Sequence, residues 1–127
     1  HHLENLLEVC TVPPMVDQIE FHPGYVQWET VKFCRASQIL VEAWSPLGRQ
    51  RLADDPLLAE LAGKYGVSQA QICLRFALDC GVVPLPKSAD AGRMRQNLAL
   101  DFALEAEDLE RLRTMPQTGW AGLHPDK

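Results

Sequence analysis

The sequence lacks a long apolar run and a region of dense positive charge. Its 127 residues carry twelve Lys and Arg against seventeen Asp and Glu, a formal net charge of −5. Binders of nucleic acids and of membrane surfaces need clustered positive charge, so this balance argues against both. The longest apolar stretch is far shorter than the roughly 18 residues of a spanning helix. No secretory signal is recognisable, and we expect a soluble, cytoplasmic protein that binds neither nucleic acid nor membranes.

The sequence also lacks the cysteine patterns of zinc sites and of disulfide-rich domains. Cys10, Cys34, Cys73 and Cys80 form no CxxC pair, and none is spaced with a His as in a zinc finger. Disulfide frameworks are typical of smaller secreted chains with few apolar residues. We therefore expect buried, reduced thiols and no metal site. A nucleophilic cysteine would need an activating base, which no nearby residue in the sequence supplies.

Helical and strand patterns alternate along the chain. Apolar residues at helical spacing predict helices, and short apolar runs that end at Pro or Gly predict strands. The predicted helices span residues 2–9, 28–37, 56–66, 68–80, 90–97 and 106–115, and the predicted strands span residues 15–21, 39–44 and 82–86. From Pro116 onward we expect a loop. The alternation indicates an α/β protein with a parallel sheet, and three strands alone would leave both sheet edges open.

Polar and aromatic residues follow the predicted strands, at the end where parallel α/β folds bind ligands. An aromatic side chain suits stacking on a heteroaromatic ring, although Trp44 taken alone is more often a core residue. Free backbone N–H groups and a Lys suit a phosphate. Lys87, Arg93 and Arg95 against Asp90 give a local charge of +2 at a predicted helix start, which favours an anion. On charge alone, a solvated surface explains this segment equally well.

Four motifs, in order and spacing, resemble the aldo-keto reductases. They are Asp17-Gln18-Ile19-Glu20 with His22-Pro23, Glu42-Ala43-Trp44-Ser45-Pro46-Leu47-Gly48, Ala70-Gln71-Ile72-Cys73-Leu74-Arg75, and Val83-Pro84-Leu85-Pro86-Lys87-Ser88 with Arg93 and Gln96-Asn97. The closing segment, residues 120–126, is similar to bacterial members. The resemblance implies a (β/α)8 TIM barrel, of which this chain resembles only the C-terminal portion. Residues 1–127 are then expected to form a single, incomplete domain.

The resemblance implies that the chain binds the nicotinamide half of NADP(H). Gln18 would hydrogen-bond the nicotinamide carboxamide, and Trp44, where the family more often has Tyr, would stack on the nicotinamide ring. Ser45, Leu47 and Gly48 would line the pyrophosphate.

The resemblance also assigns an adenosine site. Lys87, Ser88 and Arg93 would hold the 2′-phosphate, and Gln96 and Asn97 would contact the adenine. Charge-assisted bonds to the 2′-phosphate would select NADP over NAD.

The activity implied by the resemblance is the NADPH-dependent reduction of small aldehydes and ketones to alcohols by a full-length enzyme. The family's catalytic Asp, Tyr, Lys and His belong to its N-terminal half and match no position here, so we assign no catalytic residue. This portion alone is expected to be inactive or nearly so. Asp17 departs from the usual Asn, and Gly92 stands where the family often has a larger polar residue.

A second hypothesis is a non-catalytic half-barrel that self-associates through its open edges and at most binds NADP(H). Open edges and an exposed barrel interior favour self-association. The sequence begins at His1 without Met and already inside a predicted helix, which favours a piece of a longer chain.

Overall fold

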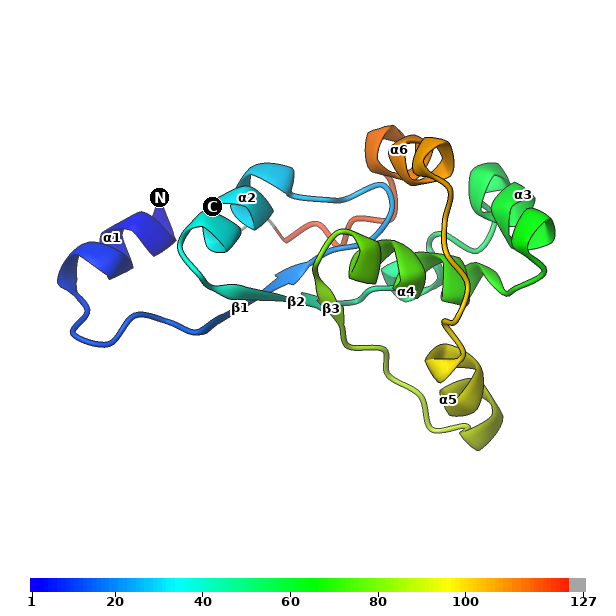
Figure 1. Cartoon of the computed structure of the whole chain (residues 1–127), viewed down its shortest axis with the longest axis horizontal. Helices are drawn as coiled ribbons and strands as arrows, with labels where there is room; N and C mark the ends of the chain where they lie inside the picture. The colour runs from blue at the N-terminus through cyan, green and yellow to red at the C-terminus, as the bar shows by residue number, and fades with distance from the viewer. Residues whose placement is uncertain (124–127) are drawn as a thin grey trace.

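The computed structural model describes residues 1–123, and its helices and strands alternate as the sequence predicts (Figure 1). The helices are α1 (His2–Val9), α2 (Trp28–Ala36), α3 (Pro56–Tyr65), α4 (Gln69–Asp79), α5 (Ala91–Leu98) and α6 (Ala106–Thr114). The strands are β1 (Val16–Glu20), β2 (Leu40–Trp44) and β3 (Val83–Pro84), and a 3-10 turn, η1, spans Gly48–Gln50. β3 is shorter than predicted, because its prolines lack the N–H groups that a strand ladder needs. Residues 116–123 form a loop, as expected, and 124–127 lie outside the described residues.

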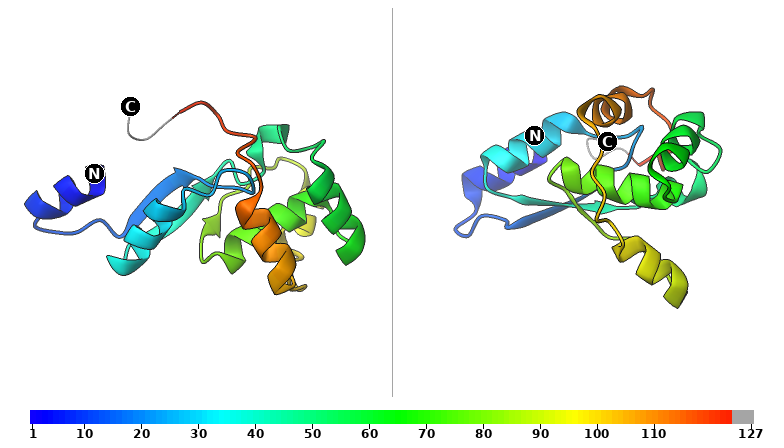
Figure 2. Two further views of the ribbon diagram at one scale, coloured as in Figure 1. Left: turned by 90° about the horizontal axis from the view of Figure 1, so that it is seen from above. Right: turned by 45° about the vertical axis from the view of Figure 1, so that its right-hand side comes forward.

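The three strands form one parallel sheet in the order β1-β2-β3. In this register Gln18 lies opposite Glu42, and Glu20 lies opposite Trp44. Helices α2, α4 and α6 lie on one side of the sheet, whereas only α5 extends on the other side (Figures 1 and 2). The sheet therefore has one covered face and one largely open face.

The core lies between the covered face of the sheet and the helices. Phe21 and Phe76 stack there with ring centroids 5.7 Å apart, and both side chains are fully buried. Other fully buried aliphatic side chains of this core include Leu58, Leu61, Ile72 and Leu112. Removal of these apolar surfaces from water is the main force that holds the helices on the sheet.

Local signals set the ends of α3 and α4. The Asp55 side chain accepts hydrogen bonds at the start of α3, where Pro56 occupies the first turn. Gly66 ends α3 with a φ of +66°, a left-handed conformation that glycine adopts without a steric cost. Ser68 and Gln71 form a capping box at the start of α4, each side chain bonding the other's backbone N–H.

The open face of the sheet exposes apolar side chains. Val16 is 45% exposed, Leu40 47% and Leu85 42%. Because side chains alternate along a strand, Gln18, next but one to Val16, shares this face. The outer edges of β1 and β3 have no strand partner within residues 1–123, which confirms the predicted open edges. In that same range, no helix has the length and apolar content to cross a membrane.

All four cysteines are free thiols. Cys34, Cys73 and Cys80 are buried, as predicted. Cys10 is only half-buried, so the prediction of burial is wrong for this residue. The difference arises because Cys10 follows α1, a helix without a buried residue.

Candidate functional site

The carboxyl ends of the strands meet at one edge of the sheet. Glu20 and Trp44, the last residues of β1 and β2, are register partners. The N–H of Leu85 donates to the Ala43 carbonyl at 3.0 Å, which continues the contact of β2 with the chain after β3. The residues that follow each strand therefore lie together along this edge.

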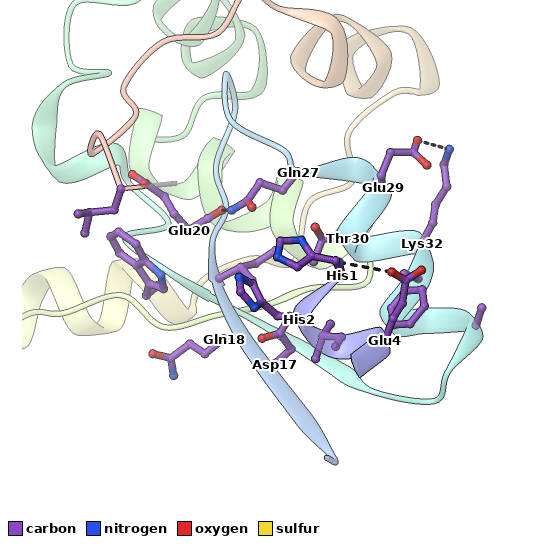
Figure 3. Close-up of a pocket in the computed structure, with 16 residues that line it drawn as sticks. His1, His2, Glu4, Asp17, Gln18, Glu20, Gln27, Glu29, Thr30 and Lys32 are labelled. Atoms are coloured by element: carbon purple, nitrogen blue, oxygen red, sulfur yellow. Dashed lines mark hydrogen bonds and ion pairs between the residues drawn. The ribbon is translucent and has the colours of Figure 1, made fainter. Parts of the chain in front are cut away.

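Gln18 and Trp44 border one cavity of about 860 Å³ between α1, β1 and α2. The Gln18 side chain lies on one side of β1, while Gln27 and Thr30 lie on the other (Figure 3). Nε2 of Gln18 donates to the Glu42 carboxylate at 3.0 Å. The structure thus brings together the two residues that the sequence assigns to the nicotinamide.

The loop after β2 has an unusual backbone. Ser45 has a φ of +51°, Arg49 of +49° and Gln50 of +68°, although none of them is glycine. Such conformations are costly and concentrate at functional sites. A Cβ on Gly48 would lie 2.7 Å from Leu52 Cγ, so this position requires glycine.

Ser45 contains the one buried side-chain polar atom without a hydrogen-bond partner in the described part of the chain, its Oγ. A buried hydroxyl without a partner costs about 1–3 kcal/mol. The loop therefore carries an unsatisfied polar group directly after Trp44. Leu47 and Gly48 continue the same loop, half-buried and buried respectively.

Arg49 is a contact of Trp44 that the sequence reasoning missed. Its guanidinium lies 5.3 Å from the centroid of the Trp44 ring, within cation–π range. Arg49 and Arg51 directly follow Gly48 in an otherwise acidic chain, and this pair of charges was a usable signal.

The predicted adenosine site lies at the end of β3 and the start of α5. Ser88 Oγ accepts from the Asp90 N–H at 3.2 Å, and the Asp90 carboxylate caps α5 by accepting from the Arg93 N–H at 2.7 Å. Lys87 is exposed, and the Arg93 guanidinium, 4.0 Å from Asp90, is largely exposed as well. A pair at this exposure contributes little to stability. The two cations are therefore accessible to an anion.

The residues predicted for the nicotinamide and those predicted for the adenosine form two separate clusters. Gln96 and Asn97 lie on α5, which extends away from the sheet (Figure 1). Within residues 1–123, no hydrogen bond or ion pair joins the adenosine residues to Gln18 or to the loop at Ser45.

A buried carboxylate, Glu20, lies beside the site at the end of β1. Glu20 is 1% exposed at its side chain, and its Oε1 lies 3.3 Å from His22 Nε2 and 3.4 Å from an Arg51 nitrogen. Both oxygens accept the Ala121 N–H. Arg51 Nε also donates to the Gly119 carbonyl at 2.6 Å. The segment 116–123, called the tail below, is thus fastened to the strand ends.

Comparisons with known proteins give the same family as the sequence motifs. The model of the Aldo/keto reductase family matches residues 1–116. An uncharacterized oxidoreductase, YtbE, of Bacillus subtilis is 39% identical over 99% of this chain and 45% of its own length. The glyoxal reductase of Bacillus subtilis is 40% identical over 100% of this chain and 46% of its own length. The chain therefore spans about half the length of these relatives.

Solved structures are similar as well. The D53A mutant of Gox0644 in complex with NADPH matches with a TM-score of 0.91 and 33% identity, over 99% of this chain and 47% of that one. An aldo-keto reductase of the silkworm Bombyx mori (AKR2E5), also with NADPH, matches with a TM-score of 0.85 and 30% identity, over 97% of this chain and 41% of that one.

Proposed function

Because the chain belongs to the aldo/keto reductase family, we propose that it is the dinucleotide-binding portion of an enzyme that reduces aldehydes and ketones with NADPH. Its three-stranded parallel sheet is part of a (β/α)8 barrel, since it matches 41–47% of barrel structures from that family. Two of these relatives were crystallised with NADPH. The glyoxal reductase among the relatives supports a small carbonyl compound as the substrate.

The buried hydroxyl of Ser45 is the observation that carries this proposal. It has no partner within the described chain, and it sits in a strained loop directly after Trp44. A phosphate oxygen would accept its hydrogen bond and recover the cost of burial. Gly48 keeps the loop close to Leu52, where any larger residue would clash. The residues present therefore fit the pyrophosphate of a dinucleotide.

Each part of the proposed site has a defined role. Bound NADPH supplies the hydride, while the protein binds and orients the cofactor. Gln18 would bind the carboxamide, and the Trp44 ring would pack on the nicotinamide. Arg49 adds positive charge beside the pyrophosphate loop. Lys87 and Arg93, both exposed, would bind the 2′-phosphate.

Titration with reduced dinucleotides tests the proposal. We expect NADPH to quench the tryptophan fluorescence of the chain at lower concentration than NADH does. The double variant Lys87→Ala/Arg93→Ala should lose at least about tenfold in NADPH affinity, the value of one charge-assisted hydrogen bond, and leave NADH binding unchanged. Arg95→Ala removes a nearby charge on α5 and serves as the control. Absence of NADPH binding by the unsubstituted chain would overturn the proposal.

The chain contributes binding and orientation but no proton donor. None of its residues matches the catalytic positions of the family, so we expect no aldehyde-dependent oxidation of NADPH by this chain. A full-length enzyme should show it, with glyoxal as the first substrate to test. Turnover by the 127-residue chain that disappears in Trp44→Ala, but not in a mock preparation, would contradict this assignment.

The open sheet face supports a second candidate, a half-barrel that self-associates. Val16, Leu40 and Leu85 are 42–47% exposed on one face, and exposed apolar patches of this kind mark interaction surfaces. Light scattering at high protein concentration should then report a dimer or larger species, which Leu40→Lys disrupts. A monomer at high concentration would exclude this candidate.

We also propose a cytoplasmic location. All four cysteines are free thiols, the state expected in a reducing compartment. Fractionation of cells that express the full-length protein, followed by antibody detection, tests this location.

A further inference from the structure

Gln18 and Glu42 form a polar pair on the open face of the sheet. They lie opposite each other in the parallel register of β1 and β2, and Gln18 Nε2 donates to Glu42 Oε2 at 3.0 Å. Glu42 is half-buried. It forms no ion pair with any Lys, Arg or His of residues 1–123. Within that range, the Glu42 carboxylate is thus bonded to a neutral amide and to no cation.

This bond defines which way the Gln18 amide points. A glutamine amide carries two N–H donors on nitrogen and a single acceptor oxygen, whereas an ionised carboxylate can only accept. The Gln18 nitrogen must therefore face Glu42, and its Oε1 must point away. Without Glu42 the amide could turn by half a rotation and present either group.

We propose that Glu42 is a positioning residue that orients Gln18 so that its Oε1 accepts an N–H from the nicotinamide carboxamide. This inference rests on the proposed function, since it requires a bound nicotinamide. Glu42 would act only through Gln18, and it would select ligands that offer a hydrogen-bond donor at that point.

The placement of Trp44 supports this role. Trp44 follows Glu42 by two positions in β2, and strand alternation places both on the same face. Trp44 and Gln18 border the same cavity. The amide that Glu42 orients therefore opens into the space beside the proposed stacking ring.

An oriented amide has a measurable consequence for ligand choice. The 3-acetylpyridine analogue of NADP⁺ retains the carbonyl oxygen of the carboxamide but replaces its NH₂ with a methyl group. It would leave the Gln18 Oε1 without a donor, and an unpaired polar group in a binding site lowers affinity. A freely rotating Gln18 could instead turn an N–H toward the acetyl oxygen and bind both ligands.

The test compares NADP⁺ with this analogue by tryptophan fluorescence. We expect the chain to prefer NADP⁺ about tenfold, the value of one hydrogen bond in a binding site. In Glu42→Ala the ratio of the two affinities should fall close to one, as in the reference variant Gln18→Ala. Glu42→Gln keeps the size of the side chain, but its amide can donate as well as accept, so it no longer forces the Gln18 nitrogen to face it and should also lose most of the preference. Circular dichroism of each variant checks its fold.

The possible results separate this inference from the proposed function. An unchanged affinity ratio in Glu42→Ala, even with weaker binding of both ligands, would overturn the positioning role, because a merely structural residue affects both ligands equally. Retention of the full preference in Glu42→Gln would also overturn it, because the acceptor-only carboxylate is what fixes the Gln18 amide. Failure of the unsubstituted chain to bind either ligand would overturn the proposed function itself.

Discussion

The Glu20 carboxylate holds the backbone N–H of Ala121 with both of its oxygens, at 3.0 and 3.1 Å, although 101 positions separate the two residues. Arg51, in the loop after β2, contacts the same carboxylate and the Gly119 carbonyl. The buried Glu20 carboxylate therefore joins the tail to the end of β1 and, through Arg51, to the loop that carries Ser45.

Substitution of Glu20 should release the tail. Glu20→Ala leaves the Ala121 N–H without its acceptor, and we expect the free energy of unfolding to fall by about 1–3 kcal/mol. Urea denaturation measures this loss, and hydrogen exchange should show faster exchange of the Ala121 amide. Glu29→Ala is the matched control, because Glu29 is 88% exposed and such surface pairs contribute little. Wild-type protection of Ala121 in Glu20→Ala would contradict the contact.

A buried aspartate should make stability depend on acid pH. Asp108 is 4% exposed and lies 2.6 Å from both the Lys64 ammonium and the Tyr65 hydroxyl. These hydrogen bonds, the one from Lys64 first, hold the pKa of Asp108 below its usual value. A lowered pKa in the folded state stabilises the protein above the ordinary aspartate pKa of about 4. That stabilisation is lost as the pH falls through the lower, folded-state pKa.

The pH dependence can be assigned to this residue by substitution. Melting temperatures between about pH 6 and 2 should converge for the wild type and Asp108→Asn at the acid end, and differ most above about pH 4. Asp101→Asn, an exposed aspartate, controls for the general effect of charge. A constant difference across the whole range would show that charge on Asp108 is not the cause.

The thiols should differ sharply in reactivity. Burial raises the pKa of Cys73 to about 12, and that of Cys34 and Cys80 to about 11. Because the thiolate is the reactive form, these three should react slowly with an aromatic disulfide reagent at pH 8. Only the half-buried Cys10 should react quickly in the native protein, and Cys10→Ser should remove that fast phase. Two or more fast thiols would contradict the buried positions.

Removal of the Ser45 hydroxyl should have opposite effects on folding and on binding. In Ser45→Ala the unpartnered buried group is gone, so stability should stay the same or rise by up to about 1 kcal/mol. NADP⁺ affinity should fall about fivefold, because a hydrogen bond to phosphate is lost. Ser68→Ala, which removes the α4 cap, should show the reverse pattern, with about 1 kcal/mol lost in stability and unchanged binding. Calorimetry and fluorescence titration measure the two quantities.

The elements of this fold were predictable because their signals are local. Gly66 ends α3, and Ser68 with Gln71 caps α4, through contacts within a few residues. The same holds for the alternation of strands and helices that defines the parallel sheet. The predicted strand at residues 82–86 is longer than β3. An apolar run alone does not show which of its residues form backbone hydrogen bonds with a neighbouring strand.

The candidate site was predictable only as a set of residues. Their position at the ends of the predicted strands indicated that Gln18, Trp44 and Ser45 could bind a ligand. The orientation and contacts of these side chains depend on neighbours that the motifs do not specify. The Gln18 amide donates a hydrogen bond to Glu42 in the neighbouring strand. The guanidinium of Arg49 lies within cation–π range of the Trp44 ring.

The sequence by itself determined the family, the element order and the residue types at the strand ends, because these depend on local pattern and on motifs. Only the tertiary structure decided that the tail fastens to Glu20, that the Ser45 Oγ is buried without a partner among the described residues, and that one sheet face is open. These features arise from contacts between segments far apart in the chain. Sequence spacing carries no information about such contacts until the chain is folded.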